Sequence, residues 1–375
     1  MTLKSRPYRR IVAKFGTSLL TSGGDHLDLE VMAALIGQVA RLRQQGAELI
    51  VVSSGAIAAG RQRLGVRHDA KDAPSRQALA AVGQSHLMQS YDSLFASHEL
   101  VVAQTLLTRR DIADRVGYLN ARNTLLALLD LGAVPIVNEN DVVAIDEIEG
   151  AVIGDNDNLS ALVANLIDAD LLAMLTDTGG LYTADPRRHP TAELIPRVER
   201  ITPEIEALAQ DTETPQGVGG MVTKLQAAKL ATAGGANVAI ASGHEPNALE
   251  RLVSGEALGT FFPATGDRME SRKRWMLAGL AARGKIVVDA GAAKALLSQG
   301  KSLLPAGVRD VKGPFDRGDT VSIYSEDGHR LAAGITNYGH EDVAAIRGLR
   351  SDRIAQALGH EYGAEVVHRN NLVLL

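Results

Sequence analysis

Cysteine is absent from the 375-residue chain, and aromatic residues make up only 3% of it. Without cysteine the chain can form no disulfide, no thiolate nucleophile and no zinc–thiolate site. No stretch approaches the ~18 uncharged apolar residues that a membrane-spanning helix needs. The apolar run near the amino terminus is broken by Lys14 and Gly16, so it predicts a strand and not a signal peptide. We therefore expect a cytoplasmic protein that does not span a membrane.

Several catalytic motifs are missing as well. The phosphate-loop pattern G-x-x-x-x-G-K-[ST] and the dinucleotide pattern G-x-G-x-x-G occur nowhere. The G-x-S-x-G elbow is also absent, which argues against an acyl hydrolase. None of the 10 histidines forms an H-E-x-x-H motif, which argues against a transition-metal site made by protein groups alone. The formal net charge of -5 gives no general reason to expect a polyanion as partner.

Apolar runs alternate with helical patterns through the first two thirds of the chain. Runs that end in glycine or polar residues predict strands, and residues 28–46 and 118–132 have the apolar spacing of helices. This alternation is typical of an α/β fold, with a mostly parallel sheet covered on both faces. Ligands of such folds bind at the carboxyl ends of the strands. The predicted strands lie within residues 10–16, 47–55, 98–108, 132–141, 169–180 and 236–243.

The pattern changes near residue 265, where a charged stretch is followed by short strands with hairpin turns. Such closely spaced turns predict a small β-barrel or sandwich. From residue 269 onward the chain has 15 Lys and Arg against 12 Asp and Glu, whereas the part before it is acidic. This change of sign supports a domain boundary, and the chain length also favours two domains.

Two lysines lie beside glycine-rich turns. Lys14 interrupts an apolar strand and is followed by Gly16 and two hydroxyl residues, an arrangement that suits a phosphate group. Lys224 follows the glycines of residues 216–220 and opens an alanine-rich helix, whose first N–H groups attract anions. Each pattern has an ordinary alternative, namely a lysine that reaches solvent from a strand end and a flexible surface loop.

Polar residues also follow other predicted strands. Thr176 and Asp177 end one apolar run and suit either a turn or a contact to a base or ribose. Ser54 opens a small-residue helix, as a helix cap or as part of an anion site. In "GDNDNLSALVA", Asn158 is the natural helix cap. A solvated loop or a substrate site would account for the three residues that precede it, which are Asp155, Asn156 and Asp157.

Several stretches together resemble one family, the bacterial glutamate 5-kinases. They occur in the family order over most of residues 9–275, and a set of this extent is highly specific. The matching stretches are "KFGTSLLT", "VSSGAIAAG", "ALAAVGQS", "LLTRRDI", "YLNARNTL", "VPIVNEND", "GDNDNLSALVA", "LTDTGGLYTADPR", "GGMVTKLQAAKLA" and "RKRW".

The resemblance implies a fold and an activity. The implied fold is α/β, the amino-acid-kinase αβα sandwich with a mostly parallel sheet, followed by a small C-terminal β-barrel that is PUA-like. The implied activity is ATP-dependent phosphorylation of the γ-carboxylate of L-glutamate, the first step of proline biosynthesis, with Mg²⁺ bridging the phosphates of the co-substrate ATP. The implied divisions are a kinase domain at 1–268, a linker at 269–282, a PUA-like domain at 283–363 and a tail at 364–375.

The family motifs also assign site residues. Lys14 and Lys224 match residues that meet the ATP phosphates, and Asp157, assisted by Asp155, matches the residue that orients both lysines. The glutamate-binding positions match Ser54, Asp141 and Asn156. Further nucleotide contacts match Thr176, Asp177, Val218, Gly219, Gly220, Met221, Val222, Thr223 and Lys224.

The chain departs from the family pattern in the phosphate loop. The family usually has hydroxyl residues where this chain has Val218 and Val222, so only backbone N–H groups can contact phosphate at these two positions. The resemblance also implies a homo-oligomer, either a dimer or a tetramer. Proline is the implied feedback inhibitor, and a glutamyl phosphate reductase is an implied partner.

Two other functions stay open at this point. One keeps the fold and changes the acceptor to aspartate, acetylglutamate, carbamate or a nucleoside monophosphate. The other is RNA binding through the PUA-like tail, because PUA domains often bind RNA. The small basic excess of the tail argues against RNA, since strong phosphate binding usually requires a denser basic face.

Overall fold

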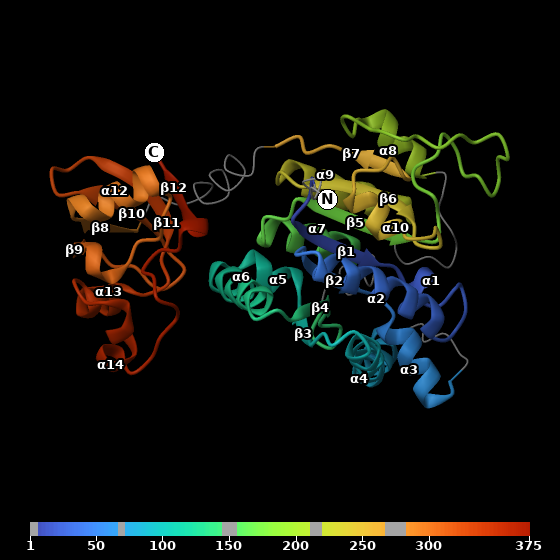
Figure 1. Cartoon of the computed structure of the whole chain (residues 1–375), viewed down its shortest axis with the longest axis horizontal. Coiled ribbons are helices and arrows are strands. Elements are labelled where there is room, and N and C mark those ends of the chain that lie inside the picture. Colours follow the sequence, from blue (N-terminus) through green and yellow to red (C-terminus); the bar gives the residue numbers. More distant parts are fainter. Residues whose placement is uncertain (1–6, 67–71, 145–155, 211–219, 267–282) are drawn as a thin grey trace. The chain divides into compact units, whose positions relative to one another are not determined.

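The computed structural model describes residues 7–66, 72–144, 156–210, 220–266 and 283–375. The chain forms two compact units (Figure 1). The first unit comprises Met1–Ala113 and Ala121–Arg268, and the second comprises Asp114–Asn120 and Met269–Leu375. The finer division expected from the sequence stays a prediction. No helix in the described ranges is long and apolar enough to cross a membrane.

The first unit is built on a seven-stranded sheet with the order β3-β4-β2-β1-β5-β6-β7. Neighbouring strands run parallel except β7, which is antiparallel to β6. The predicted, mostly parallel α/β sheet is thereby confirmed. The strands are β1 (Arg10–Phe15), β2 (Glu48–Ser53), β3 (Val102–Leu107), β4 (Val134–Glu139), β5 (Leu171–Thr176), β6 (Asn237–Ser242) and β7 (Thr260–Phe262).

Helices pack on both faces of this sheet. Ile11, Ala13 and Phe15 of β1 share a buried apolar cluster with α2, α4 and α10. Helix α7 contacts β1 and β5, packs on α9, and has its buried residues outside that cluster. Because side chains alternate along a strand, Lys14 lies on the α7 face. The helices are α1 (Thr17–Leu20), α2 (Leu29–Gln44), α3 (Ala56–Leu64), α4 (Ala73–Ala96), α5 (Arg109–Ala113), α6 (Arg115–Asp130), α7 (Asn156–Leu166), α8 (Pro203–Gln210), α9 (Met221–Ala233) and α10 (Ala248–Val253).

The second unit has its own five-stranded sheet, in the order β12-β11-β10-β8-β9. Strands β8 and β10 are parallel, and the other pairs are antiparallel. This separate sheet confirms the small β domain that the hairpin signals predicted. Its elements are β8 (Gly284–Val288), α12 (Ala290–Gln299), β9 (Val308–Lys312), β10 (Thr320–Ser325), β11 (Arg330–Ile335), α13 (His340–Ile346), α14 (Ile354–Leu358) and β12 (Leu372–Leu374).

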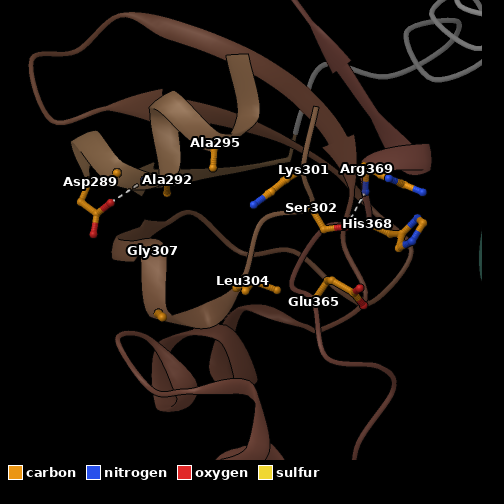
Figure 2. A pocket seen from close by; sticks show the side chains of 12 residues that line it. Asp289, Ala292, Ala295, Lys301, Ser302, Leu304, Gly307, Glu365, His368 and Arg369 are labelled. Carbon is orange, nitrogen blue, oxygen red and sulfur yellow. Dashed lines mark hydrogen bonds between the residues drawn. The ribbon is translucent and has the colours of Figure 1, made fainter. Parts of the chain in front are cut away.

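A cavity of about 640 Å³ lies in the second unit beside α12. Figure 2 shows the side chain of Lys301 extending toward the space between α12 and Leu304. The charged groups that line the cavity are of both signs, so they do not form a dense basic face. They are Asp289, Lys301, Glu365 and Arg369.

Candidate active site

Lys14 lies near the carboxyl end of β1, a central strand of the sheet. In the strand register it is level with Val52 of β2 and Met174 of β5. Its side chain is buried and turns over Gly16, where an added Cβ atom would lie 3.6 Å from Lys14 Nζ. The backbone N–H of Gly16 donates to Leu175 O at 3.2 Å and fixes this turn. The ammonium group is therefore buried at the edge of the sheet where α/β folds bind ligands.

Asp157 lies between two lysines. It is the second residue of α7, and its side chain is 1% exposed. Its Oδ1 atom is 2.6 Å from Lys14 Nζ, and its Oδ2 atom is 3.3 Å from Lys224 Nζ. The hydroxyl of Thr223 donates to Oδ2 at 2.7 Å. Three elements far apart in the sequence, β1, α7 and α9, thus converge on one carboxylate.

Burial and the neighbouring charges shift the pKa values of Asp157 and Lys224. Burial raises the pKa of the Asp157 carboxyl, but the ammonium groups of Lys14 and Lys224 more than offset it and lower that pKa to about 2. Burial lowers the pKa of Lys224, Asp157 opposes this effect, and the charge of Lys14 lowers the pKa further. With both lysines protonated, two ammonium groups face one carboxylate. The surplus positive charge suits an anionic ligand.

Helix α9 begins beside the same cluster. Its N-cap is Gly220, and no side chain of the described residues caps the helix start. A Cβ atom added at Gly220 would meet no atom within 4 Å in the part of the chain that the structure describes. The first N–H groups of a helix have no partner within the helix and carry its positive dipole end. The helix start and Lys224 therefore form an arrangement that binds phosphate or carboxylate oxygens.

The end of β5 lies close to this helix start. Thr176 is the last residue of β5, and its hydroxyl donates to Asp177 Oδ1 at 2.9 Å. Asp177 is exposed, and its charge acts on Lys224. The two residues that the sequence selected for nucleotide contacts are therefore near the lysine selected for the phosphates.

A buried network of polar side chains lies on the other side of Asp157. The amide of Asn156 donates to Ser54 Oγ at 3.2 Å and to Asn138 Oδ1 at 3.0 Å. The amide of Asn138 donates in turn to Gln84 Oε1 at 2.8 Å. The sequence reading missed Asn138 and Gln84, although both occur in quoted motif stretches, "VPIVNEND" and "ALAAVGQS".

Tyr91 supports the turn that presents Ser54. Its hydroxyl is 2.8 Å from Ser53 Oγ, which in turn donates to Ser54 O at 2.9 Å. Burial raises the pKa of the Tyr91 hydroxyl, so this group stays a neutral donor. The turn continues through Gly55, whose φ of 101° is in the left-handed region that favours glycine.

The structure brings some of the predicted site residues together, and others lie apart or outside the described ranges. Asp141 lies in the turn after β4, three residues beyond Asn138. Three predicted positions, Asp155, Val218 and Gly219, lie outside the described residues. The predicted residues in direct contact form three groups. Lys14, Asp157, Thr223 and Lys224 make the charged cluster, Ser54 and Asn156 belong to the amide network, and Thr176 contacts Asp177.

Residues 9–242 match the model of the amino acid kinase family. The chain belongs to the amino acid kinase family. Within this amino acid kinase, residues 284–358 additionally match the PUA domain. That range falls inside the second unit and includes most of its separate sheet.

Relatives of this amino acid kinase match over nearly their whole length. The glutamate 5-kinase of Dehalococcoides mccartyi strain 195 is 57% identical over 368 residues, which cover 98% of this chain and 99% of the relative. The glutamate 5-kinase of Herpetosiphon aurantiacus is 52% identical, with 98% of each chain covered. That of Deinococcus radiodurans is 50% identical, with 98% of this chain and 100% of the relative covered.

Proposed function

We propose that this chain transfers the terminal phosphoryl group of ATP to the γ-carboxylate of L-glutamate and forms L-glutamyl 5-phosphate, the first step of proline biosynthesis. The observation that carries the proposal is the Lys14–Asp157–Lys224 cluster at the carboxyl edge of the sheet. Full-length relatives named glutamate 5-kinase at 50–57% identity support the choice of acceptor.

The reaction needs positioning more than proton transfer. A glutamate side chain has an unperturbed pKa of about 4.3, so the attacking carboxylate is already an anion at neutral pH. One of its oxygens bonds to the γ-phosphorus while the bond to the β-phosphate oxygen breaks and ADP leaves. The main barrier is that two anions must meet. Cationic groups that contact the transferred group lower that barrier, and in-line placement supplies most of the rest.

The residues around Asp157 suit this task. Lys14 and Lys224 supply positive charge toward the triphosphate, and the start of α9 supplies N–H donors. Asp157 contacts both ammonium groups and so fixes their positions relative to each other. The ion pairs with the two lysines occupy both carboxylate oxygens of Asp157. We therefore assign Asp157 a positioning role.

The acceptor site would lie beside this cluster. Ser54 and Asn156 belong to the amide network next to Asp157. The Ser54 hydroxyl accepts from Asn156, and its own proton suits a carboxylate of glutamate. Both amide hydrogens of Asn156 are already donated, and its buried Oδ1, which has no hydrogen-bond partner among the described residues, suits the amino group of glutamate. Asp141, in the turn after β4, is our choice for the amino group of glutamate, since an ammonium ion needs an anionic or carbonyl partner. Asn138 joins this set as a residue that orients Asn156.

Mg²⁺ is proposed as the companion of ATP. Within the described ranges no group of three or more His, Asp or Glu side chains forms a metal cage. Mg²⁺ keeps several waters and commonly binds through substrate phosphates, so the triphosphate itself would supply most of its ligands. When bound, the metal neutralises charge on the phosphate oxygens.

A coupled assay of ADP release across candidate acids tests the proposal. L-Glutamate should support turnover, while aspartate, acetylglutamate, carbamate and nucleoside monophosphates should not. Hydroxylamine should trap the product as a hydroxamate, since an acyl phosphate reacts with this nucleophile. Chelation of Mg²⁺ by EDTA should stop the reaction, and excess Mg²⁺ should restore it. Turnover with another acceptor and none with glutamate would contradict the proposal.

Several finer statements stay predictions from the family resemblance. They are a cytoplasmic location, a dimer or tetramer, feedback inhibition by proline, and a glutamyl phosphate reductase as receiver of the product. The same assay with and without proline tests the inhibition. A salt-dependent RNA gel shift tests the alternative function, and the mixed charges around the cavity of the second unit argue against tight RNA binding.

A further inference from the structure

The last carbonyl groups of helix α7 all accept hydrogen bonds. The N–H of Ala169 donates to Ala164 O at 2.8 Å, and the N–H of Asp168 donates to Asn165 O. These two bonds form the turn that commonly closes a helix. The last four carbonyls of a helix lack partners within it, and in α7 they belong to residues 163–166. Val163 O accepts from the N–H of Ile167, so Leu166 O remains to be satisfied, together with Ile167 O just beyond the helix.

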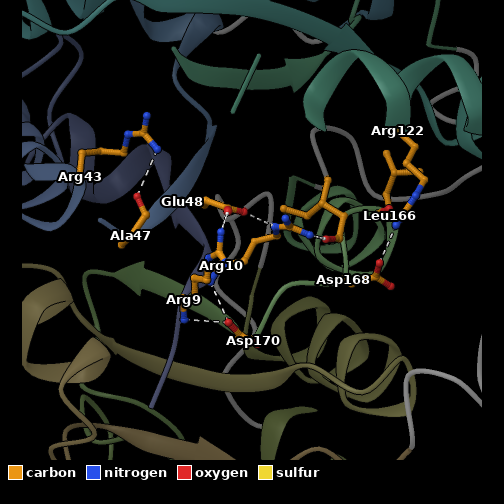
Figure 3. A network of polar contacts seen from close by, with 10 residues as sticks. Arg9, Arg10, Arg43, Ala47, Glu48, Arg122, Leu166, Asp168 and Asp170 are labelled. Atoms are coloured by element: carbon orange, nitrogen blue, oxygen red, sulfur yellow. Dashed lines mark hydrogen bonds and ion pairs between the residues drawn. The ribbon is translucent and has the colours of Figure 1, made fainter. Parts of the chain in front are cut away.

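Two arginines from other elements bind these two carbonyls. Arg122 of α6 donates to Leu166 O through Nη1 and to Asp168 Oδ2 at 2.6 Å through Nη2. Arg10 of β1 donates to Ile167 O at 2.6 Å. Figure 3 shows both guanidinium groups directed at the end of α7. Both positive charges also face the negative end of the helix dipole.

The buried arginine is the uncommon part of this helix end. The Arg122 side chain is fully buried, and burial of a guanidinium is unfavourable unless its charge is paired. Asp168 has a φ of 55°, a conformation that glycine adopts more easily. The backbone bonds of Asp168 and Ala169 already close the helix, so the closing turn itself does not require the buried arginine. The arrangement therefore suggests a task other than closing the helix.

The contacts that join α7 to β1 are separated by nearly the same length on the helix and on the strand. Lys14 and Arg10 are four residues apart on a strand, a length of about 13 Å. Asp157 and Ile167 are ten residues apart along a helix, a length of about 15 Å. Arg10 contacts Ile167 and Lys14 contacts Asp157, so the helix runs opposite to the strand. Fixing Ile167 on Arg10 thus brings Asp157 level with Lys14.

We propose that Arg122 and Arg10 are positioning residues of the phosphoryl-transfer site. They fix α7 lengthwise along β1, and through α7 they fix Asp157 between Lys14 and Lys224. Arg122 lies in the stretch "YLNARNTL", to which neither the sequence nor the site assigned a role. The inference rests on the proposed function for its catalytic consequence, but the positioning itself is a property of the fold.

A purely structural arginine would behave differently from a positioning one. A structural role affects the folded fraction and leaves kcat per folded molecule and its pH profile unchanged. If α7 shifts, Asp157 moves away from Lys224. Asp157 raises the pKa of Lys224, whereas burial and the charge of Lys14 lower it, so the pKa of Lys224 should fall when Asp157 moves away. The alkaline limb of the pH profile should then move to lower pH.

The test compares Arg122→Met with Arg43→Met. Arg43 donates to Ala47 O at 3.1 Å (Figure 3). It also donates to Gly132 O at 2.8 Å, and neither of these carbonyls belongs to α7. For Arg122→Met we expect kcat to fall about 10- to 100-fold with little change in the KM for ATP, since displacements near 1 Å can have this effect. Arg43→Met should keep kcat and the pH profile, and Arg122→Lys should recover part of the loss.

Hydrogen exchange supplies a readout without turnover. Arg122→Met should speed exchange of the backbone amides in residues 156–160 as well as at the far end of α7. Faster exchange confined to the last turn, with unchanged kcat and pH profile, would overturn the inference. If Arg122→Met does not fold, Asp168→Asn removes the carboxylate charge that pairs with Arg122, and asparagine tolerates positive φ. It should change kcat in the same direction but less, and no change would overturn the inference.

The two proposals can fail separately. A wild-type chain that does not phosphorylate glutamate refutes the proposed function. The exchange comparison between Arg122→Met and Arg43→Met still decides whether the arginine pair positions the start of α7.

Discussion

The ammonium group of Lys14 lies 2.6 Å from one carboxylate oxygen of Asp157, and Lys224 lies 3.3 Å from the other. One buried carboxylate thereby separates two like charges that would otherwise repel each other in a region of low dielectric. The pair of lysines is held ready for a ligand that carries more negative charge than a single carboxylate.

Removal of either lysine should slow turnover. Loss of one charge-stabilising donor raises the barrier by about 3 kcal/mol, or roughly 100-fold in rate. We expect Lys14→Ala and Lys224→Ala each to lose at least that much in kcat per folded molecule, since removal of one partner of a buried ion pair also lowers stability. Lys229→Ala is the matched control, because Lys229 lies on the same helix, is exposed and pairs with Glu206 at 2.7 Å. Near-normal turnover in either site variant would remove that lysine from the catalytic residues.

Activity should fall on the alkaline side before an ordinary lysine would lose its proton. Burial and the charge of Lys14 both lower the pKa of Lys224. As pH rises through this lowered pKa, Lys224 becomes neutral and the cluster loses the charge that attracts phosphate. In Lys14→Ala the repulsion is gone, so the alkaline limb of the residual kcat/KM profile should move to higher pH. An unmoved limb would show that another group titrates there.

The stability of the fold should respond to acid through Asp157. Its pKa is lowered from 3.8 to about 2, so the ionised form is favoured in the folded state. The resulting stabilisation is present above the unfolded pKa and is lost as pH falls from about 4 through about 2. Urea unfolding of wild type and Asp157→Asn between pH 2 and 6 measures this. The difference between them should shrink as pH falls, and a constant difference would refute the assignment.

Asp141 should act on the acceptor and not on the nucleotide. Asp141→Asn removes the negative charge proposed to bind the amino group of glutamate. We expect the KM for glutamate to rise far more than the KM for ATP. Asn138→Ala provides a comparison, because Asn138 contacts Asn156 and, being neutral, cannot supply the charge lost in Asp141→Asn, so it should raise the glutamate KM less. A uniform rise of both KM values in Asp141→Asn would indicate structural damage instead.

The crossing of α3 and α4 depends on Gly83. A Cβ atom added there would lie 1.8 Å from Ala56 O and 2.3 Å from Gly60 N, both backbone atoms that cannot move independently. Gly83→Ala should therefore lower the free energy of unfolding and displace α3, which follows Ser54. Gly37→Ala in α2 is the control, since its Cβ would meet only the flexible end of Arg41 at 3.3 Å. Alanine in a helix interior is favoured by roughly 0.5–1 kcal/mol over glycine. Equal thermal unfolding of both variants would contradict this reading.

The sequence predicted most of the features that depend on neighbouring residues, but the helix cap expected at Asn158 was wrong, because α7 begins at Asn156 and Asn158 is its third residue. Lys14 and Thr176 stand at the ends of apolar strands, and Lys224 stands after glycines at a helix start, so the topology alone places them at one edge. Asn138 and Gln84 were missed because their role depends on which way two side chains turn across 54 residues of chain. The hydrogen bond from Arg122 to Leu166 O could not be predicted from the sequence for the same reason, since no local pattern identifies the side chain that binds a helix end.

The matched lengths of β1 and α7 have a consequence for how this chain can diverge. Deletion of one residue inside α7 would turn Asp157 by about 100° around the helix axis and withdraw it by about 1.5 Å. Point substitutions along the helix surface are tolerable by comparison, but a change of length is not. Natural variation in this segment should therefore consist of replacements, with insertions and deletions excluded between the two anchored ends.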